Sequence, residues 1–332
     1  MDATPLDEAT LPDYLRRLGL VRVGDRVEVE PAGDGNINWV RRARSGERSW
    51  IVKQARPELE RFPEYRVTTD RILFEARWLA TVRPLDAEQV CPAVVRFDPE
   101  ARALVLEDIG DAPRLDHVLA RRPDAGCEPA RRLARFLGAV HAATRDPGLA
   151  ARFENDAMRR LHGEHIFALP FHPNEFPLPP ALRARAEALW RDREIVAIAD
   201  AAHRRYLEPR GALLHGDVQA GNVLLAPIGP VLLDAEIAHV GDPAFDLGTL
   251  FAHLWLPAVA RGAPDEASET IEAAWLAYAG ASGAPPALRR DAERYAAIEM
   301  LRRTLGAARV EVATEPEAGL AIADYAIERL RS

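Results

Sequence analysis

The chain has 332 residues and a formal net charge of −8, with 48% hydrophobic and 28% charged residues. This length favours two domains or lobes, and the composition excludes a collagen-like, low-complexity or disordered chain. The acidic balance argues against a protein whose main task is to bind nucleic acid. No apolar run is long enough to cross a bilayer, and Cys91 and Cys127 are too few for a disulfide scaffold. We therefore expect a cytoplasmic protein without a membrane anchor.

The first third of the chain has the pattern of a small antiparallel sheet with helices. Alternating apolar residues indicate strands, whereas apolar residues at helical spacing indicate helices. The expected elements are a helix at 11–20, strands at 26–30, 37–44 and 49–54, a helix at 68–82, and strands at 94–97 and 103–106. These elements predict an N-terminal lobe over residues 1–108.

Helical periodicity dominates the rest of the chain, which predicts a larger C-terminal lobe over residues 109–332. We expect helices at 115–120, 129–144, 180–206, 267–279 and 287–312, with short strands at 211–214, 223–225 and 231–233. Residues 163–180 are rich in Pro, Phe and His and have no period, so they predict a long loop. The predicted fold class is α+β with two lobes.

One lysine stands among many arginines. Of the 43 basic residues, 42 are arginine and one is Lys53. A lysine ammonium is a compact charge on a flexible stem, suited to reaching a phosphate oxygen and a carboxylate without a planar fork. Chance explains a single lysine equally well when it is taken alone. The surrounding motifs must therefore decide whether Lys53 has a functional role.

The strongest motif is a polar loop between two short apolar strands, over residues 213–225. It contains Asp217, then Asn222 five residues later, and Asp234 follows twelve residues after that. This set supplies a base for an acceptor hydroxyl and two oxygen ligands for Mg²⁺, which is the pattern of kinase-type phosphoryl transfer. Such a transfer depends on positioning and charge neutralisation rather than on covalent help from the protein.

The His-Gly-Asp start of this loop, together with residues 241–247, resembles the aminoglycoside phosphotransferase and choline kinase branch of the kinase-like fold. The resemblance implies a small-molecule kinase that uses ATP and Mg²⁺, in which the N-terminal lobe binds the nucleotide. It also implies an ion pair between Lys53 and Glu75 that directs the ammonium to the α- and β-phosphates. The remaining nucleotide contacts that it implies are Gly33, Gly35 and Asn36 in a phosphate loop, and Glu107 and Ile109 in a hinge at the adenine.

Further segments resemble methylthioribose kinases, namely residues 33–38, 52–57, 68–71, 234–236 and 300–306. In that family an acidic motif like Asp234-Ala235-Glu236 faces Mg²⁺, and a double arginine like Arg302-Arg303 lies at the sugar. The resemblance therefore implies that Asp217 takes the proton of a sugar hydroxyl, and that the metal ligands are Asp234 with Asn222 or Glu236. The implied acceptor is methylthioribose or a related pentose.

Two other functions stay open at this stage. An aminoglycoside or other antibiotic phosphotransferase would bind a polycation, which Arg302 and Arg303 would repel. A nucleotide-binding scaffold without activity would be expected to lack Lys53, Asp217 or Asp234, and all three are present. We expect a small-molecule substrate and no nucleic acid or membrane partner. The apolar C-terminal helices are compatible with a homodimer.

Overall fold

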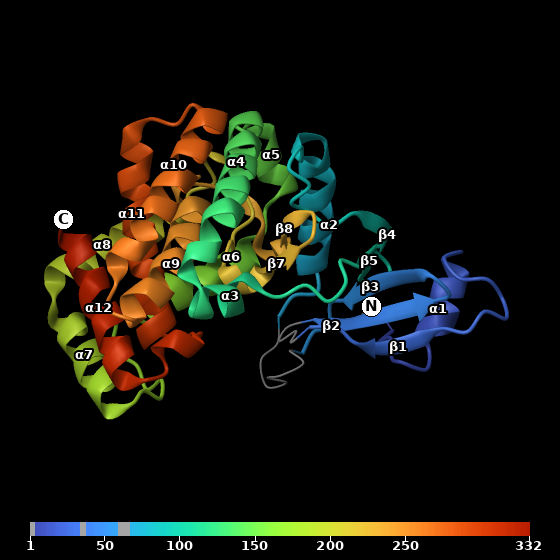
Figure 1. The fold of residues 1–332 in the computed structure, drawn as a ribbon, viewed down its shortest axis with the longest axis horizontal. Helices are drawn as coiled ribbons and strands as arrows, with labels where there is room; N and C mark the ends of the chain where they lie inside the picture. Colours follow the sequence, from blue (N-terminus) through green and yellow to red (C-terminus); the bar gives the residue numbers. More distant parts are fainter. Residues whose placement is uncertain (1–3, 34–37, 59–66) are drawn as a thin grey trace. The chain divides into compact units, whose positions relative to one another are not determined.

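The computed structural model describes residues 4–33, 38–58 and 67–332, and the chain divides into two compact units (Figure 1). Unit 1 comprises Met1–Pro84 and Cys91–Asp111, and unit 2 comprises Leu85–Val90 and Ala112–Ser332. Among the described residues, no helix combines the length and the apolar character that crossing a membrane requires.

Unit 1 is built on a five-stranded antiparallel sheet in the order β1-β2-β3-β5-β4. Each expected strand and helix of this unit has a counterpart within a few residues of its predicted ends. The elements are α1 (Leu11–Arg17), β1 (Glu28–Pro31), β2 (Trp39–Ser45), β3 (Arg48–Gln54), α2 (Arg71–Val82), β4 (Val94–Asp98) and β5 (Ala103–Glu107).

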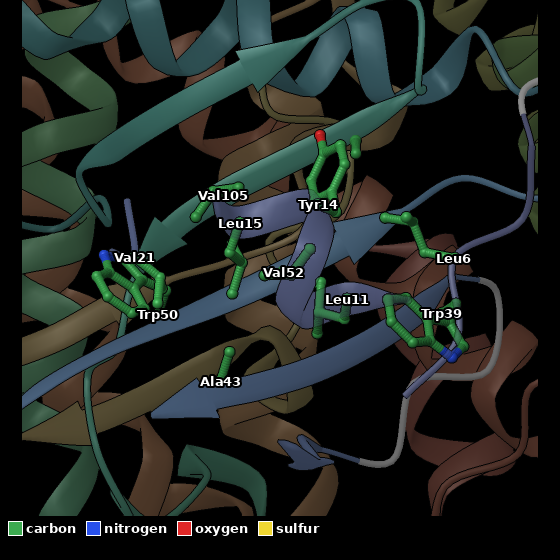
Figure 2. Packing of buried hydrophobic residues seen from close by; sticks show 11 residues of the cluster. Leu6, Leu11, Tyr14, Leu15, Val21, Trp39, Ala43, Trp50, Val52 and Val105 are labelled. Atoms are coloured by element: carbon green, nitrogen blue, oxygen red, sulfur yellow. The ribbon is translucent and has the colours of Figure 1, made fainter. Parts of the chain in front are cut away.

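The alternation of residues along β3 assigns its two faces. Trp50 and Val52 belong to the apolar cluster that α1 covers, and Figure 2 shows Leu11 and Leu15 of that helix beside them. Successive side chains of a strand point to opposite faces. Lys53, which follows Val52, is therefore directed to the other face of the sheet.

Unit 2 is mainly helical, and Figure 1 shows α4 alongside α10. Its helices are α3 (Leu115–Arg121), α4 (Cys127–Ala143), α5 (Gly148–Arg152), α6 (Asp156–Gly163), α7 (Pro180–Arg191), α8 (Arg193–Tyr206), α9 (Ala244–Ala260), α10 (Ser268–Ser282), α11 (Pro286–Leu305) and α12 (Pro316–Arg331). Two antiparallel strand pairs complete it, β6 (Ala212–Leu214) with β9 (His239–Gly241) and β7 (Val223–Ala226) with β8 (Gly229–Leu232).

Several expected elements of unit 2 differ from the structure. The helix expected at 180–206 is divided at Asp192, whose extended backbone ends α7 and whose carboxylate caps α8 by accepting from Ile195 N–H at 3.2 Å. The helix expected at 287–312 ends at Leu305, before Gly306. Four helices were not predicted, α5, α6, α9 and α12. Of these, α9 is buried over nearly its whole length and so has no polar face, whereas α12 carries ordinary start and end signals.

The loop expected at 163–180 is partly helical. Residues Glu164–Ala168 form a π-helical turn directly after α6. Ile166 and Phe167 of this turn are buried, and the Phe167 ring stacks on His203 with centroids 5.2 Å apart. The apolar side chains of the segment therefore fix it against α8, and the expectation of a loop was wrong for its first part.

Candidate active site

The buried pair of Lys53 and Glu75 lies within unit 1. Lys53 comes from β3 and Glu75 from α2, and Lys53 Nζ lies 2.7 Å from Glu75 Oε2. The two side chains are only 4% and 3% exposed. Because a buried charge is costly unless it is paired, each of these residues needs the other. The ion pair that the sequence predicted is therefore formed.

The other residues predicted to contact the nucleotide also belong to unit 1. Gly33 follows β1 with a φ of 68°, a conformation that glycine adopts without strain. Gly35 and Asn36 lie outside the described residues. Glu107 ends β5, and its Oε1 accepts from Ala93 N–H at 2.6 Å. Ile109, two residues further on, is half-buried.

In unit 2, the loop between β6 and β7 holds the predicted base, Asp217. Asp217 Oδ2 accepts from Gln219 Nε2 at 2.8 Å and from Asn222 Nδ2 at 2.9 Å. Asp217 Oδ1 is buried and has no hydrogen-bond partner among the described residues. The two carboxylate oxygens therefore differ, since one is held by amides and the other is available to a ligand.

A glycine is required directly before this base. Gly216 has a φ of 86°, and a Cβ built on it would lie 2.8 Å from the carbonyl oxygen of Ile237. Both the left-handed backbone and the close approach exclude a larger side chain. This requirement explains the His-Gly-Asp form of the motif in this chain.

Asp246 holds the same loop from the first turn of α9. It is fully buried and accepts from the backbone N–H groups of His215 at 2.8 Å and Gly216 at 2.9 Å. A third contact joins it to His141 Nε2 at 3.2 Å. Burial alone would raise the pKa of Asp246, but the contact with His141 and the backbone donors outweigh it and hold the pKa below its usual range. An ionised carboxylate thus anchors the backbone that carries Asp217.

The predicted metal ligands lie at the ends of β7 and β8. Leu233 N–H donates to the carbonyl oxygen of Asn222 at 2.8 Å, which ties the end of the loop to the residue before Asp234. Asp234 has φ 66° and ψ 51°, an uncommon backbone for a residue with a side chain. Glu236 is buried, and its carbonyl oxygen accepts from Asn155 Nδ2 at 2.9 Å.

This donor set fits a hard divalent cation. In the part of the chain that the structure describes, no group of three His, Cys, Asp or Glu side chains has the arrangement of a metal site. The predicted set instead combines the amide oxygen of Asn222 with carboxylates of Asp234 and Glu236. Oxygen ligands of this kind suit Mg²⁺, which keeps several waters and takes few protein ligands.

The two predicted substrate arginines lie beside the base. Arg302 and Arg303 are on α11 and are only 7% and 6% exposed. Arg303 Nη2 is 3.8 Å from Asp217 Oδ1, the carboxylate oxygen without a hydrogen-bond partner. Both guanidinium groups contact the carboxylate of Glu299, also on α11. The two arginines are therefore buried and do not form ordinary ion pairs of the surface.

Two residues of this cluster, Gln219 and Glu299, were not predicted from the sequence. Gln219, which donates to Asp217, lies only two residues from it in the sequence. Glu299 precedes Arg302 and Arg303 by three and four residues, the spacing at which side chains meet on a helix, so periodicity could have found it. The structure brings together Asp217, Asn222 and Arg303 in unit 2.

Comparison with known proteins identifies the family. The model of a family described as "Phosphotransferase enzyme family" matches residues 28–290. Methylthioribose kinase of Bacillus anthracis is 27% identical over 339 aligned positions, which cover 92% of this chain and 85% of that protein.

Solved structures show the same fold at low sequence identity. Choline kinase from Streptococcus pneumoniae has a TM-score of 0.54 at 17% identity and covers 98% of both chains. Spectinomycin phosphotransferase, solved with ADP and spectinomycin, has a TM-score of 0.56 at 12% identity and covers 99% of both chains. The predictions of a kinase-like α+β fold and of a phosphotransferase are confirmed. The chain belongs to the phosphotransferase enzyme family, as a member similar to methylthioribose kinases.

Proposed function

We propose that the protein is an ATP- and Mg²⁺-dependent kinase that phosphorylates a hydroxyl group of methylthioribose or a related pentose. The observation that carries this proposal is the free Oδ1 of Asp217 beside Arg303 Nη2, 3.8 Å away. A hydroxyl group can donate to a carboxylate and accept from a guanidinium at the same time. Asp217 and Arg303 thus supply a hydrogen-bond acceptor and a hydrogen-bond donor for one sugar hydroxyl.

In this proposal Asp217 is the catalytic base. Its Oδ1 takes the hydroxyl proton as the acceptor oxygen bonds to the γ-phosphorus of ATP, and the bond to ADP breaks. Gln219 and Asn222 hold Oδ2, so the carboxylate keeps one orientation while the proton moves. Arg303 stabilises negative charge that builds up on the transferring group.

The other predicted residues bind the donor. Lys53, oriented by Glu75, contacts the α- and β-phosphates, and Glu107 and Ile109 bind the adenine through their backbone. Asp234, with Asn222 or Glu236, would hold Mg²⁺. When bound, the metal neutralises charge on the nucleotide phosphates.

The charge of the cluster favours a sugar over an aminoglycoside. A polycationic antibiotic needs a surplus of carboxylates in its site, as like charges at close range repel strongly where little water screens them. Here Asp217 and Glu299 face Arg302 and Arg303, so acids are not in excess. The aminoglycoside alternative therefore lacks the electrostatic feature that it requires.

The test is ADP release from MgATP with a panel of acceptors. The panel contains methylthioribose, other pentoses, choline, homoserine and several aminoglycosides, and the Asp217→Asn variant serves as the control for hydrolysis unrelated to the site. Turnover confined to methylthioribose or another pentose supports the proposal. Turnover of aminoglycosides, with pentoses inactive, contradicts it.

A further inference from the structure

Glu299 contacts both arginines that lie next to the base. Its Oε1 accepts from Arg303 Nε at 2.6 Å and from Arg302 Nη1 at 3.1 Å, and its Oε2 lies 3.2 Å from the same Arg302 nitrogen. His253 of α9 approaches from another side, with Nε2 3.6 Å from Glu299 Oε1. Glu299 is only 2% exposed. One buried carboxylate therefore fixes the positions of both arginines.

The charges of this cluster cancel. Burial alone would raise the pKa of Glu299, but Arg302 and Arg303 outweigh it and hold the pKa well below its usual range. Burial lowers the pKa of His253, so its imidazole is neutral at neutral pH. Two guanidinium groups thus face two carboxylates, those of Glu299 and Asp217. Without Glu299 the same site would carry one uncompensated positive charge.

Two guanidinium nitrogens without hydrogen-bond partners indicate what the cluster can bind. Arg302 Nε and Arg303 Nη2 are buried and have no hydrogen-bond partner among the described residues. Buried donors of this kind require an acceptor. An uncharged hydroxyl satisfies them without disturbing the balance of charge, whereas an anion would leave the site with a net negative charge at low dielectric.

We propose that Glu299 is a positioning residue that determines acceptor specificity. It holds Arg302 and Arg303 in one arrangement and cancels one of their charges, so that the site accepts an uncharged polyhydroxylated molecule and rejects an anionic one. This inference rests on the proposed function, because it places the acceptor at Asp217 and the two arginines.

The test compares Glu299→Gln with the wild type, using inorganic phosphate as the anionic probe. At saturating MgATP, we expect the KM for the pentose acceptor to rise about tenfold, because the amide no longer holds both guanidiniums. We expect phosphate, as a competitive inhibitor against the acceptor, to bind at least tenfold more tightly. If Glu299 had a purely structural role, its replacement would weaken the binding of both the acceptor and phosphate. Weaker binding of the acceptor together with tighter binding of phosphate therefore identifies an effect of the Glu299 charge.

Two further variants control the result. Glu299→Asp keeps the charge but shortens the side chain, and should raise the KM for the acceptor without tighter phosphate binding. Glu272→Gln removes a partly exposed acid that pairs with Arg289 on the surface of the same unit, and should change neither. The inference is overturned if folded Glu299→Gln binds phosphate no more tightly, or if Glu299→Asp gains the same affinity.

Calorimetric titration of phosphate in the presence of ADP separates this inference from the proposed function. Absence of pentose turnover in the wild type would contradict the proposed function. The difference in phosphate affinity between wild type and Glu299→Gln needs no turnover, so it tests the effect of the Glu299 charge on anion binding separately from the identity of the acceptor.

Discussion

The ammonium of Lys53 and the carboxylate of Glu75 form a buried ion pair with 2.7 Å between Nζ and Oε2. Arginine fills every other basic position of the chain, so cationic charge alone does not explain this lysine. The surrounding space accepts a compact charge, and a planar guanidinium would need a wider site and a different approach to the carboxylate.

The Lys53→Arg variant tests whether shape matters at this position. Because the charge is kept but the guanidinium cannot take the place of the ammonium, we expect kcat/KM for ATP to fall roughly 100-fold. Steady-state kinetics with varied MgATP measure the effect. Arg22→Lys, a reverse exchange at an exposed position of the same unit, is the control and should not change kcat/KM. Full activity of Lys53→Arg would show that lysine has no functional advantage over arginine at this position.

Replacement of the base should separate catalysis from nucleotide binding. In Asp217→Asn, the amide cannot take the hydroxyl proton, and we expect kcat to fall by about 10³ or more while the affinity for ATP is nearly unchanged. Gln219→Ala removes one of two donors to Oδ2 and should reduce kcat only about tenfold. Stopped-flow or coupled assays measure both rates, and near-normal turnover of Asp217→Asn would show that another group is the base.

Loss of the Asp246 carboxylate should reduce both stability and turnover. Asp246→Asn replaces one acceptor oxygen by an NH₂ group that faces backbone N–H donors. We expect the free energy of unfolding to fall by about 3 kcal/mol, in the range for a broken buried charge network. Urea denaturation measures the change. The control is Asp265→Asn, at an exposed position in the same unit, which should not change the midpoint of urea denaturation.

Acidification should destabilise the protein through buried histidines. Burial lowers the pKa of His239 from 6.5 to about 4, so between these pH values the unfolded chain binds more protons than the folded one. The free energy of unfolding therefore decreases as the pH falls through this window, by roughly 3 kcal/mol from His239 alone.

The His239→Asn variant isolates this contribution. Its amide can replace the contact of His239 Nδ1 with the Ile237 carbonyl oxygen, 2.8 Å away, but does not titrate. Urea denaturation at pH 7 and pH 5 should show a smaller loss of stability in the variant than in the wild type. Equal losses in the two proteins would mean that His239 is not protonated on unfolding in this range.

The local elements of the site could be predicted from the sequence, but the long-range contacts that hold these elements in place could not. The strand that carries Lys53 and the loop that carries Asp217 follow from short patterns of apolar and polar residues. The contacts of Asp246 with the backbone of His215 and Gly216 join residues about thirty positions apart, and no periodicity reveals them. The buried state of Arg302 likewise depends on how α9 and α11 pack.

The left-handed backbone of Asp234 lowers the stability of the protein at a position where the proposed activity requires a carboxylate. At φ 66° and ψ 51° an aspartate is strained by about 1 kcal/mol relative to glycine, which accepts this conformation freely. A library of variants selected only for heat resistance should thus contain more Asp234→Gly than the same library selected for turnover. The same library selected for turnover should retain aspartate. Sequencing of the two pools would show whether the proposed role of Asp234 in metal binding outweighs the cost of its backbone conformation.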